Sequence, residues 1–304
     1  MITISKKKYR LSNNYRIIGE SFLEQDNIEK ALTYFKKSKE FGGAYQDIDM
    51  LLDMAFIYYE KDELILAQKL FKEILTLNPD ESRVYFGLGL VYEDSEDYNL
   101  AIESYLNAIK IDQNYQQAYF FLAGVYQRKD DFKNSEKYYL KAIKMDKEDY
   151  WSILNLGSLY EEYDMDDKAE RLFKKAYRLN PDNPTSSFNL GVIYGKKGDL
   201  VKAEKYYNIS LSLDPVNPFI YLNLSVYYKE MKMYTEAIQW LDRGIDKNPE
   251  KAFLYYHRSC LYLLTDNKEK AILDAKTACQ LDDFFIDYIN KDEDLNELAD
   301  YLDK

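Results

Sequence analysis

Histidine is nearly absent from this sequence of 304 residues, in which His257 stands alone. A metal site that needs two or more histidines is therefore excluded. The two cysteines, Cys260 and Cys279, are too few for a disulfide framework and form no C-x-x-C pair, so we expect free thiols in a reducing cytoplasm. No arrangement of residues indicates a catalytic site, a metal site or a cofactor.

Long apolar runs are also missing, since the longest are stretches such as 84–92 and 118–126. A membrane-spanning helix needs about 20 apolar residues. The basic residues near the N-terminus are not followed by the apolar segment of a secretory signal. We therefore expect a cytoplasmic protein without a membrane span.

Positive charge is in deficit, because 41 lysines and arginines face 53 acidic residues, for a net charge of -12. A polyanion would be repelled, so nucleic acid is not an expected partner. Only 11 glycines and 6 prolines are present, which excludes collagen-like and low-complexity chains. The hydrophobic content of 46% is sufficient for a sizeable core.

The few prolines reveal an internal repeat. Pro181, Pro215 and Pro249 are 34 residues apart, and Pro184 and Pro218 repeat the interval. Tyrosines recur with the same spacing, at Tyr58, Tyr92, Tyr126, Tyr160, Tyr194, Tyr228 and Tyr262. Because proline does not continue a helix, these residues mark the boundaries of repeated units.

Each unit has the pattern of two helices joined by a tight turn. In residues 82–115, apolar side chains recur at offsets of three and four in two stretches, which are separated by the polar residues 94–97. A small residue in the second stretch, Ala101 in this unit, lets the two helices approach closely. The pattern predicts a helix–turn–helix in every unit.

This pattern resembles the tetratricopeptide repeat family. The residues that carry the resemblance in one unit are Leu156, Gly157, Tyr160, Ala169, Phe173, Ala176 and Pro181. Eight repeats follow from it, at residues 12–47, 48–81, 82–115, 116–149, 150–183, 184–217, 218–251 and 252–285. The resemblance implies an all-α fold, a right-handed superhelical α-solenoid whose first helices line the concave face.

The two ends of the chain are expected to differ from the repeats. Residues 286–304 are predicted to form a capping helix over the last repeat, because a solenoid otherwise leaves an apolar face bare. Its packed side would contain Ile286, Ile289, Leu295, Leu298 and Leu302. Residues 1–11 are expected to be a mobile N-terminal tail.

Arg258 interrupts a column of core leucines in the last repeat. An unpaired buried cation is costly, and Asp274 is expected on the facing helix beside Ala275, which replaces a larger aromatic residue. We predict an ion pair between Arg258 and Asp274. The alternative is an arginine that binds an anionic ligand.

Two columns on the first helices are candidate peptide-binding residues. The second position of the repeat is polar in the first four repeats but holds Trp151, Phe219 and Phe253 in three of the last four. Exposed aromatics of this kind indicate a contact surface. The alternative is that these rings lean on the neighbouring helix.

The sixth position holds Asn155, Asn189 and Asn223 in succession and then His257. Each carboxamide can donate and accept, which suits a peptide backbone. The row resembles the asparagine ladder of O-linked N-acetylglucosamine transferase, although asparagine is also a usual residue at this position in the family.

The carboxylate clamp of chaperone-adaptor repeats, which is made of lysine, arginine and asparagine, is missing. The matching positions are mostly apolar, as at Phe86, Phe120, Leu154 and Leu222. This absence argues against binding of acidic chaperone tails.

The function expected from these features is that of a non-enzymatic scaffold for protein–protein interaction, which binds an extended peptide or a partner helix in its concave groove. The alternative is a regulatory or sensor protein, or the targeting subunit of a larger enzyme complex, with the repeats as receptor for a signalling peptide. The partner itself is not indicated.

Overall fold

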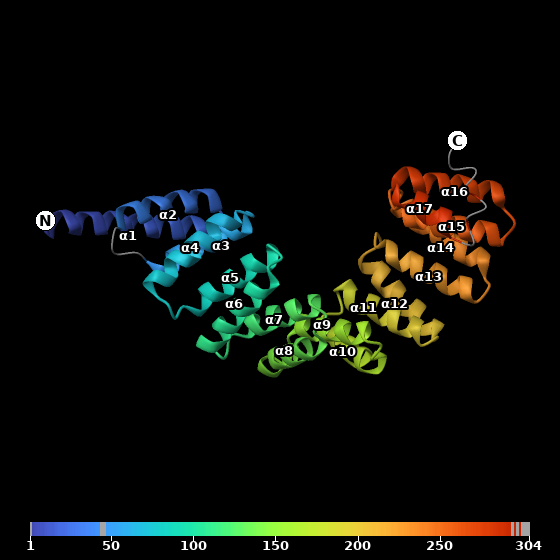
Figure 1. Ribbon diagram of the computed structural model, residues 1–304, viewed down its shortest axis with the longest axis horizontal. Coiled ribbons are helices and arrows are strands. Elements are labelled where there is room, and N and C mark those ends of the chain that lie inside the picture. The colour runs from blue at the N-terminus through green and yellow to red at the C-terminus, as the bar shows by residue number, and fades with distance from the viewer. Residues whose placement is uncertain (1, 43–46, 293–294, 296–297, 299–304) are drawn as a thin grey trace. The chain divides into compact units, whose positions relative to one another are not determined.

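The computed structural model describes residues 2–42, 47–292, 295 and 298, and the regular elements within these residues are α-helices. Helices α1 to α8 are Ile2–Glu24, Ile28–Gly42, Ile48–Glu60, Leu64–Leu77, Ser82–Asp94, Tyr98–Ile111, Gln116–Arg128 and Phe132–Met145. Helices α9 to α17 are Tyr150–Glu162, Asp166–Leu179, Pro184–Lys196, Leu200–Leu213, Pro218–Glu230, Tyr234–Lys247, Ala252–Leu264, Lys268–Leu281 and Phe284–Lys291. Figure 1 shows α1 to α16 as successive antiparallel pairs, which are followed by α17.

The helices begin at a constant interval. From α3 to α15 the first helix of each pair starts 34 residues after the previous one, and from α4 to α16 the second helices do the same. The fold is therefore an α-solenoid of helix-turn-helix repeats, as the sequence predicts. The chain divides into two compact units, residues 1–155 and 156–304, so the right-handed superhelical course of the whole chain stays a prediction.

Several pairs are held together by an aromatic residue on the second helix that packs against a glycine on the first helix. A Cβ atom on Gly89 would lie 2.3 Å from the ring of Tyr105, and one on Gly191 would lie 2.5 Å from the ring of Tyr207. Both rings are buried. Burial of such a side chain contributes about 2–3 kcal/mol, and the contact requires that the facing residue stay small.

The turns inside the repeats share one backbone conformation. The second residue after the end of the first helix has a positive φ, at Asp26, Asp62, Glu96, Asp130, Asp164, Gly198, Lys232 and Asp266. Several second helices then begin with an aspartate whose side chain accepts a hydrogen bond from the backbone N–H three residues on, as Asp97 does from Leu100. The turn and its cap recur because the same residue types recur.

The N-terminal end differs from the expected tail. Residues 2–11 are the beginning of α1, which continues without a break to Glu24. The hydroxyl of Ser12 donates to the Ser38 carbonyl at 2.9 Å, which anchors this part of α1 against α2. Residues 2–11 contain neither glycine nor proline, so nothing in them ends the helix.

The C-terminal end also differs from the expected single helix over 286–304. α17 begins two residues earlier and ends at Lys291, because Asp292 has an extended backbone, with ψ of 120°. Phe285, Ile289, Leu295 and Leu298 are buried in one cluster with α15 and α16. Ile286 is 36% exposed, contrary to expectation, and Leu302 lies outside the described residues.

The ion pair expected in the last repeat is confirmed. Arg258 on α15 contacts Asp274 on α16, and the distance from Nε to Oδ2 is 2.7 Å. Its guanidinium also contacts Asp242 on α14, with an Nη1–Oδ1 distance of 2.6 Å. The pKa of Arg258 is raised, because these two carboxylates outweigh the effect of burial.

Candidate functional site

The seven candidate binding residues are divided between the two units. Trp151 and Asn155 belong to the first unit, at the start of α9. The other five belong to the second unit and are Asn189 on α11, Phe219 and Asn223 on α13, and Phe253 and His257 on α15.

Trp151 is an exposed aromatic residue. Its side chain is 54% exposed, and its ring lies edge-on to the ring of Tyr150, with 5.0 Å between the centroids. Asn155 follows one turn later on the same helix and is half-buried. An indole and a carboxamide therefore share one face of α9.

Phe219 and Phe253 form a stacked pair in the second unit. Their ring centroids are 5.5 Å apart and the ring planes differ by 12°. Phe219 is nevertheless 53% exposed, whereas Phe253 is half-buried. The two rings thus lean on each other across two repeats, and Phe219 still leaves apolar surface exposed.

Asn223 is partly used by the fold itself. Its Nδ2 donates a hydrogen bond to the hydroxyl of Tyr207, at 3.1 Å. One N–H and the carbonyl oxygen of Asn223 are left for other contacts. Asn189 is half-buried like Asn223 and lies one repeat before it on α11.

Asn223 also lines a hollow between three helices of the second unit. The hollow has a volume of about 330 Å³. Its other lining residues are Val192, Gly195, Lys196, Tyr207, Val226, Tyr227 and Glu230. Sequence analysis did not identify these residues, although Gly195 carries a signal, since the matching position of most repeats holds a large side chain.

His257 is a neutral hydrogen-bonding group at neutral pH. Burial lowers its pKa to about 4, and the positive charge of Lys229 on α13 acts in the same direction. Its ring lies edge-on to the ring of Tyr256, with 5.0 Å between centroids. A neutral imidazole offers one donor and one acceptor, much as a carboxamide does.

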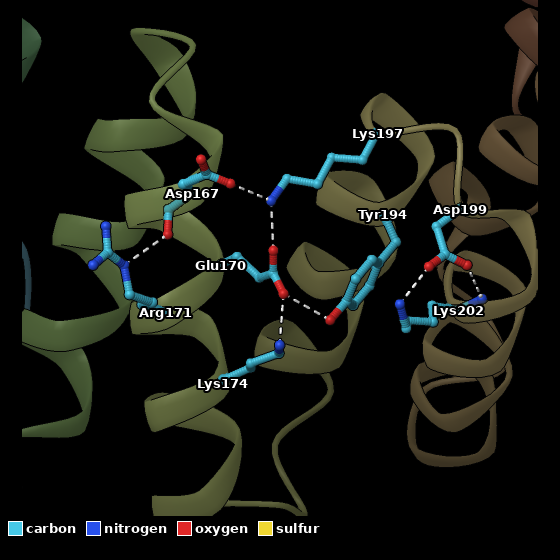
Figure 2. Close-up of polar contacts among 8 residues, drawn as sticks. All are labelled: Asp167, Glu170, Arg171, Lys174, Tyr194, Lys197, Asp199 and Lys202. Atoms are coloured by element: carbon cyan, nitrogen blue, oxygen red, sulfur yellow. Dashed lines mark hydrogen bonds and ion pairs between the residues drawn. The ribbon is translucent and has the colours of Figure 1, made fainter.

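A cluster of paired charges lies on α10 and α11 of the second unit. Figure 2 shows Lys174, Lys197 and Tyr194 around the carboxylate of Glu170, at 2.6, 2.5 and 2.8 Å. Burial alone would raise the pKa of Glu170, but these three hydrogen bonds lower it to about 2. Lys197 also contacts Asp167, at 2.7 Å. This cluster links α10 to α11.

Lys196, the one lysine among the residues that line the hollow, is likewise paired. Its Nζ lies 2.5 Å from Glu161 Oε1 on α9 and 3.7 Å from Asp164 Oδ1. Among the described residues, no group of three or more histidine, cysteine or acidic side chains is arranged to hold a metal ion. Within the same part of the chain, no helix has the length and apolarity that crossing a membrane requires.

Family models agree with the geometry of the repeats. Tetratricopeptide repeat models match residues 82–115, 116–149, 167–218 and 220–251, which together make up half of the chain. The chain belongs to the tetratricopeptide repeat family. A Sel1 repeat model matches residues 9–40 of this tetratricopeptide repeat protein, a range that begins inside α1.

Solved tetratricopeptide repeat structures share the fold. A tetratricopeptide repeat protein from Parabacteroides merdae aligns with a TM-score of 0.63 and 18% identity, over 84% of this chain and 99% of that chain. PilF from Pseudomonas aeruginosa aligns with a TM-score of 0.59 and 20% identity, over 72% and 96%. At these identities the likeness concerns the fold alone.

A structure of the APC/C hetero-tetramer Cut9–Hcn1 gives a TM-score of 0.61 at 17% identity. That alignment covers 91% of this tetratricopeptide repeat protein and 53% of the other chain, so this chain spans about half the length of that relative. Comparison with curated protein sequences gave no match.

Proposed function

We propose that this protein is a non-enzymatic scaffold that binds an extended peptide or a partner helix on the first helices of its repeats. Tetratricopeptide repeats serve as protein-interaction scaffolds, which supports the general class. The observation that carries the finer proposal is a pairing along three first helices. A large aromatic and a polar hydrogen-bonding residue lie one turn apart at Trp151 and Asn155, Phe219 and Asn223, and Phe253 and His257.

The two residue types have complementary roles in this proposal. The aromatic rings supply apolar area for the side chains of the partner, and the half-exposed Phe219 is the strongest candidate in the second unit. The carboxamides of Asn155, Asn189 and Asn223 and the neutral His257 bind backbone N–H and C=O groups, whose chemistry does not depend on the sequence of the peptide.

The proposed partner is a protein or peptide rather than nucleic acid, because the net charge of -12 repels a polyanion. The clamp needed for acidic chaperone tails is absent from the sequence, so we do not propose a chaperone as partner. Cys260 and Cys279 are buried and not joined in a disulfide among the described residues, which fits the reducing cytoplasm as the proposed location.

The experiment is to recover a partner by pull-down from the native cell and to titrate the purified partner against variants. Changing Asn155, Asn189 and Asn223 together to alanine should weaken binding by about 3 kcal/mol, or roughly a hundredfold. Trp151→Ala should cost at least about 2 kcal/mol.

Control variants separate this site from general damage to the fold. Trp240→Ala removes an indole from the second helix α14, and Asn114→Ala removes an exposed carboxamide outside the proposed site, so neither should change the affinity. The Asn223→Ala change also removes a hydrogen bond to Tyr207, so its thermal stability must be measured alongside. Affinity within twofold of the wild type for both the triple variant and Trp151→Ala would refute the proposed site.

A further inference from the structure

Three buried tyrosines occupy the same position on the second helix of their repeats, at Tyr105, Tyr139 and Tyr207. The hydroxyl of Tyr105 donates to Glu93 Oε2 at 2.6 Å. The hydroxyl of Tyr139 can donate to Gln127 Oε1 at 3.1 Å. In both repeats the acceptor is the side chain twelve residues before the tyrosine, at the end of the first helix.

Tyr207 lacks this acceptor, because the residue twelve positions before it is Gly195. A Cβ atom on Gly195 would meet nothing within 4 Å, so the space of the missing side chain is open. Tyr207 is 4% exposed, and its hydroxyl oxygen accepts from Asn223. That contact leaves the hydroxyl proton for the hollow that Tyr207 and Gly195 line together.

The residue 35 positions after the acceptor indicates which kind of ligand group the hollow can bind. Glu93 is followed at this distance by Arg128, whose Nη1 lies 2.7 Å from Glu93 Oε1. For Gln127 the corresponding residue is Glu162, and for Gly195 it is Glu230, which lines the hollow. At this spacing the anionic acceptor Glu93 is followed by a cation, whereas the neutral Gln127 is followed by an acid in the sequence. Gly195 is also followed by an acid, so Glu230 favours a neutral carboxamide over a carboxylate in the hollow.

We propose that this hollow binds a carboxamide, the side chain of a glutamine or asparagine in the partner polypeptide. Its carbonyl oxygen accepts from the hydroxyl of Tyr207, and its N–H group donates to the carboxylate of Glu230. Val192 and Val226 contact its methylene groups. The ligand takes the place that the side chain of Gln127 has in its own repeat. The inference rests on the proposed function and adds a specificity pocket to it.

Other side chains fit the hollow less well. The carboxylate of a glutamate or aspartate would lie near Glu230, and the charge of Lys196 is already matched by Glu161. An apolar side chain would leave the proton of the buried Tyr207 hydroxyl without an acceptor, which is unfavourable. A volume of about 330 Å³ is ample for one side chain together with the adjoining backbone.

The vacant acceptor can be tested without any partner. Gly195→Gln supplies a carboxamide from within the chain, and Gly195→Ala is the matched control for helix propensity. We expect a higher melting temperature for Gly195→Gln than for Gly195→Ala, and we expect the difference to vanish when Tyr207→Phe is present in both. Equal melting temperatures in the Tyr207 background would overturn the claim that this hydroxyl lacks an acceptor.

The specificity is tested with a displayed library of random peptides, selected on the full-length wild-type protein. Selected peptides should share a glutamine or asparagine, should lose binding to Gly195→Gln, and should bind Tyr207→Phe about fivefold more weakly, the effect of one neutral hydrogen bond. Tyr139→Phe is the control, because Tyr139 already has Gln127 as its partner, and should leave binding unchanged.

The outcomes distinguish the pocket from the general proposal. If the selected peptides share an acidic or apolar residue instead, the proposal that the hollow binds a carboxamide is wrong. Peptides that lose binding to Phe219→Ala but bind Gly195→Gln as well as the wild type would overturn the pocket and leave the proposed function standing. If no peptide is enriched, the proposed function fails, and the pocket fails with it.

Discussion

Arg258 donates two hydrogen bonds to Asp274, from Nε to Oδ2 at 2.7 Å and from Nη2 to Oδ1 at 2.8 Å. Asp274 is 4% exposed, so this contact lies in the interior of the last repeat. The neighbouring Ala275 stands where six of the other seven repeats hold a phenylalanine or tyrosine, and its small size leaves room for the guanidinium. A salt bridge thus replaces the leucine and aromatic packing of the other repeats.

Asp274→Ala should lower the free energy of unfolding by about 3 kcal/mol, because it leaves the cation of Arg258 without its buried partner. The double variant Arg258→Leu with Asp274→Ala should recover much of this loss, since the leucine restores the residue of the other repeats. Chemical denaturation measures both changes.

Asp242→Ala is the control for this pair. Asp242 is a half-exposed partner of the same arginine, so its removal should cost less than about 1 kcal/mol. An Asp274→Ala protein with the unfolding curve of the wild type would show that the pair does not stabilise the last repeat and would favour a ligand-binding role for Arg258.

The stability of the first unit should depend on pH through Asp53 on α3. Burial, followed by the charges of Asp49 and Glu20, raises the pKa of Asp53 from 3.8 to about 6, against the opposing effect of Arg83. The folded state therefore binds the Asp53 proton more tightly than the unfolded state does. As pH rises from about 4 to 6, this group lowers the free energy of unfolding, and the loss of stability remains above pH 6.

Asp53→Asn should therefore raise the free energy of unfolding at pH 7 by about 1–2 kcal/mol, after allowance for solvent screening, and should flatten its pH dependence in that window. Denaturation at a series of pH values measures both effects. Arg83→Gln should steepen the same dependence, because Arg83 is the cation that opposes the shift. A pH profile that Asp53→Asn leaves unaltered would contradict the prediction.

Ser135 offers a simple gain in stability. Its hydroxyl is fully buried and has no hydrogen-bond partner among the described residues, and alanine occupies the equivalent position of most other repeats. Ser135→Ala should raise the free energy of unfolding by about 1 kcal/mol, because an unsatisfied polar group leaves the interior. Ser210 is the matched control.

The hydroxyl of Ser210 is equally buried but donates to the Pro184 carbonyl at 3.0 Å. Ser210→Ala should lower stability by about 1 kcal/mol. Thermal denaturation of Ser135→Ala and Ser210→Ala measures both effects. Melting temperatures that shift in the same direction would contradict the prediction.

Two glycines in α11 should respond to alanine with opposite signs. A Cβ on Gly191 would lie 2.5 Å from the Tyr207 ring, so Gly191→Ala should cost about 1–3 kcal/mol. A Cβ on Gly195 meets open space, so Gly195→Ala should stabilise the helix by about 0.5–1 kcal/mol. Denaturation curves of the two variants measure these changes in the free energy of unfolding. A loss of stability in Gly195→Ala would mean that this space is not open in solution.

Much of the fold could be predicted because spacing alone encodes it. The 34-residue recurrence of proline and tyrosine gave the helix pairs, and the exchange of leucine for Arg258 pointed to Asp274. The ends were predicted less well, because they have no repeat to compare with. Residues 2–11 lack an apolar pattern yet contain no helix breaker, and α17 packs Phe285 rather than Ile286 against the last repeat.

The candidate site could be predicted only as columns of residues. Position in the repeat identified Phe219 and Phe253, but not that their rings stack on each other. It identified Asn223 as a candidate peptide-binding carboxamide, but not that its Nδ2 donates a hydrogen bond to the hydroxyl of Tyr207. The significance of the open space at Gly195 follows from the hydrogen bonds that the tyrosine hydroxyls make in two other repeats. Those contacts are a property of side-chain packing, which sequence spacing does not give.

Because the packing is local, the repeats can fold while the chain is still being synthesised. Within each unit the main contacts join a helix to the next one or two helices along the chain. A ribosome adds about 5–20 residues per second, so a repeat of 34 residues takes about 2–7 seconds to synthesise. Helices and tight turns form within microseconds. Each newly emerged repeat can therefore pack on the one before it while the next is still being translated, so folding can proceed from the N-terminus along the chain.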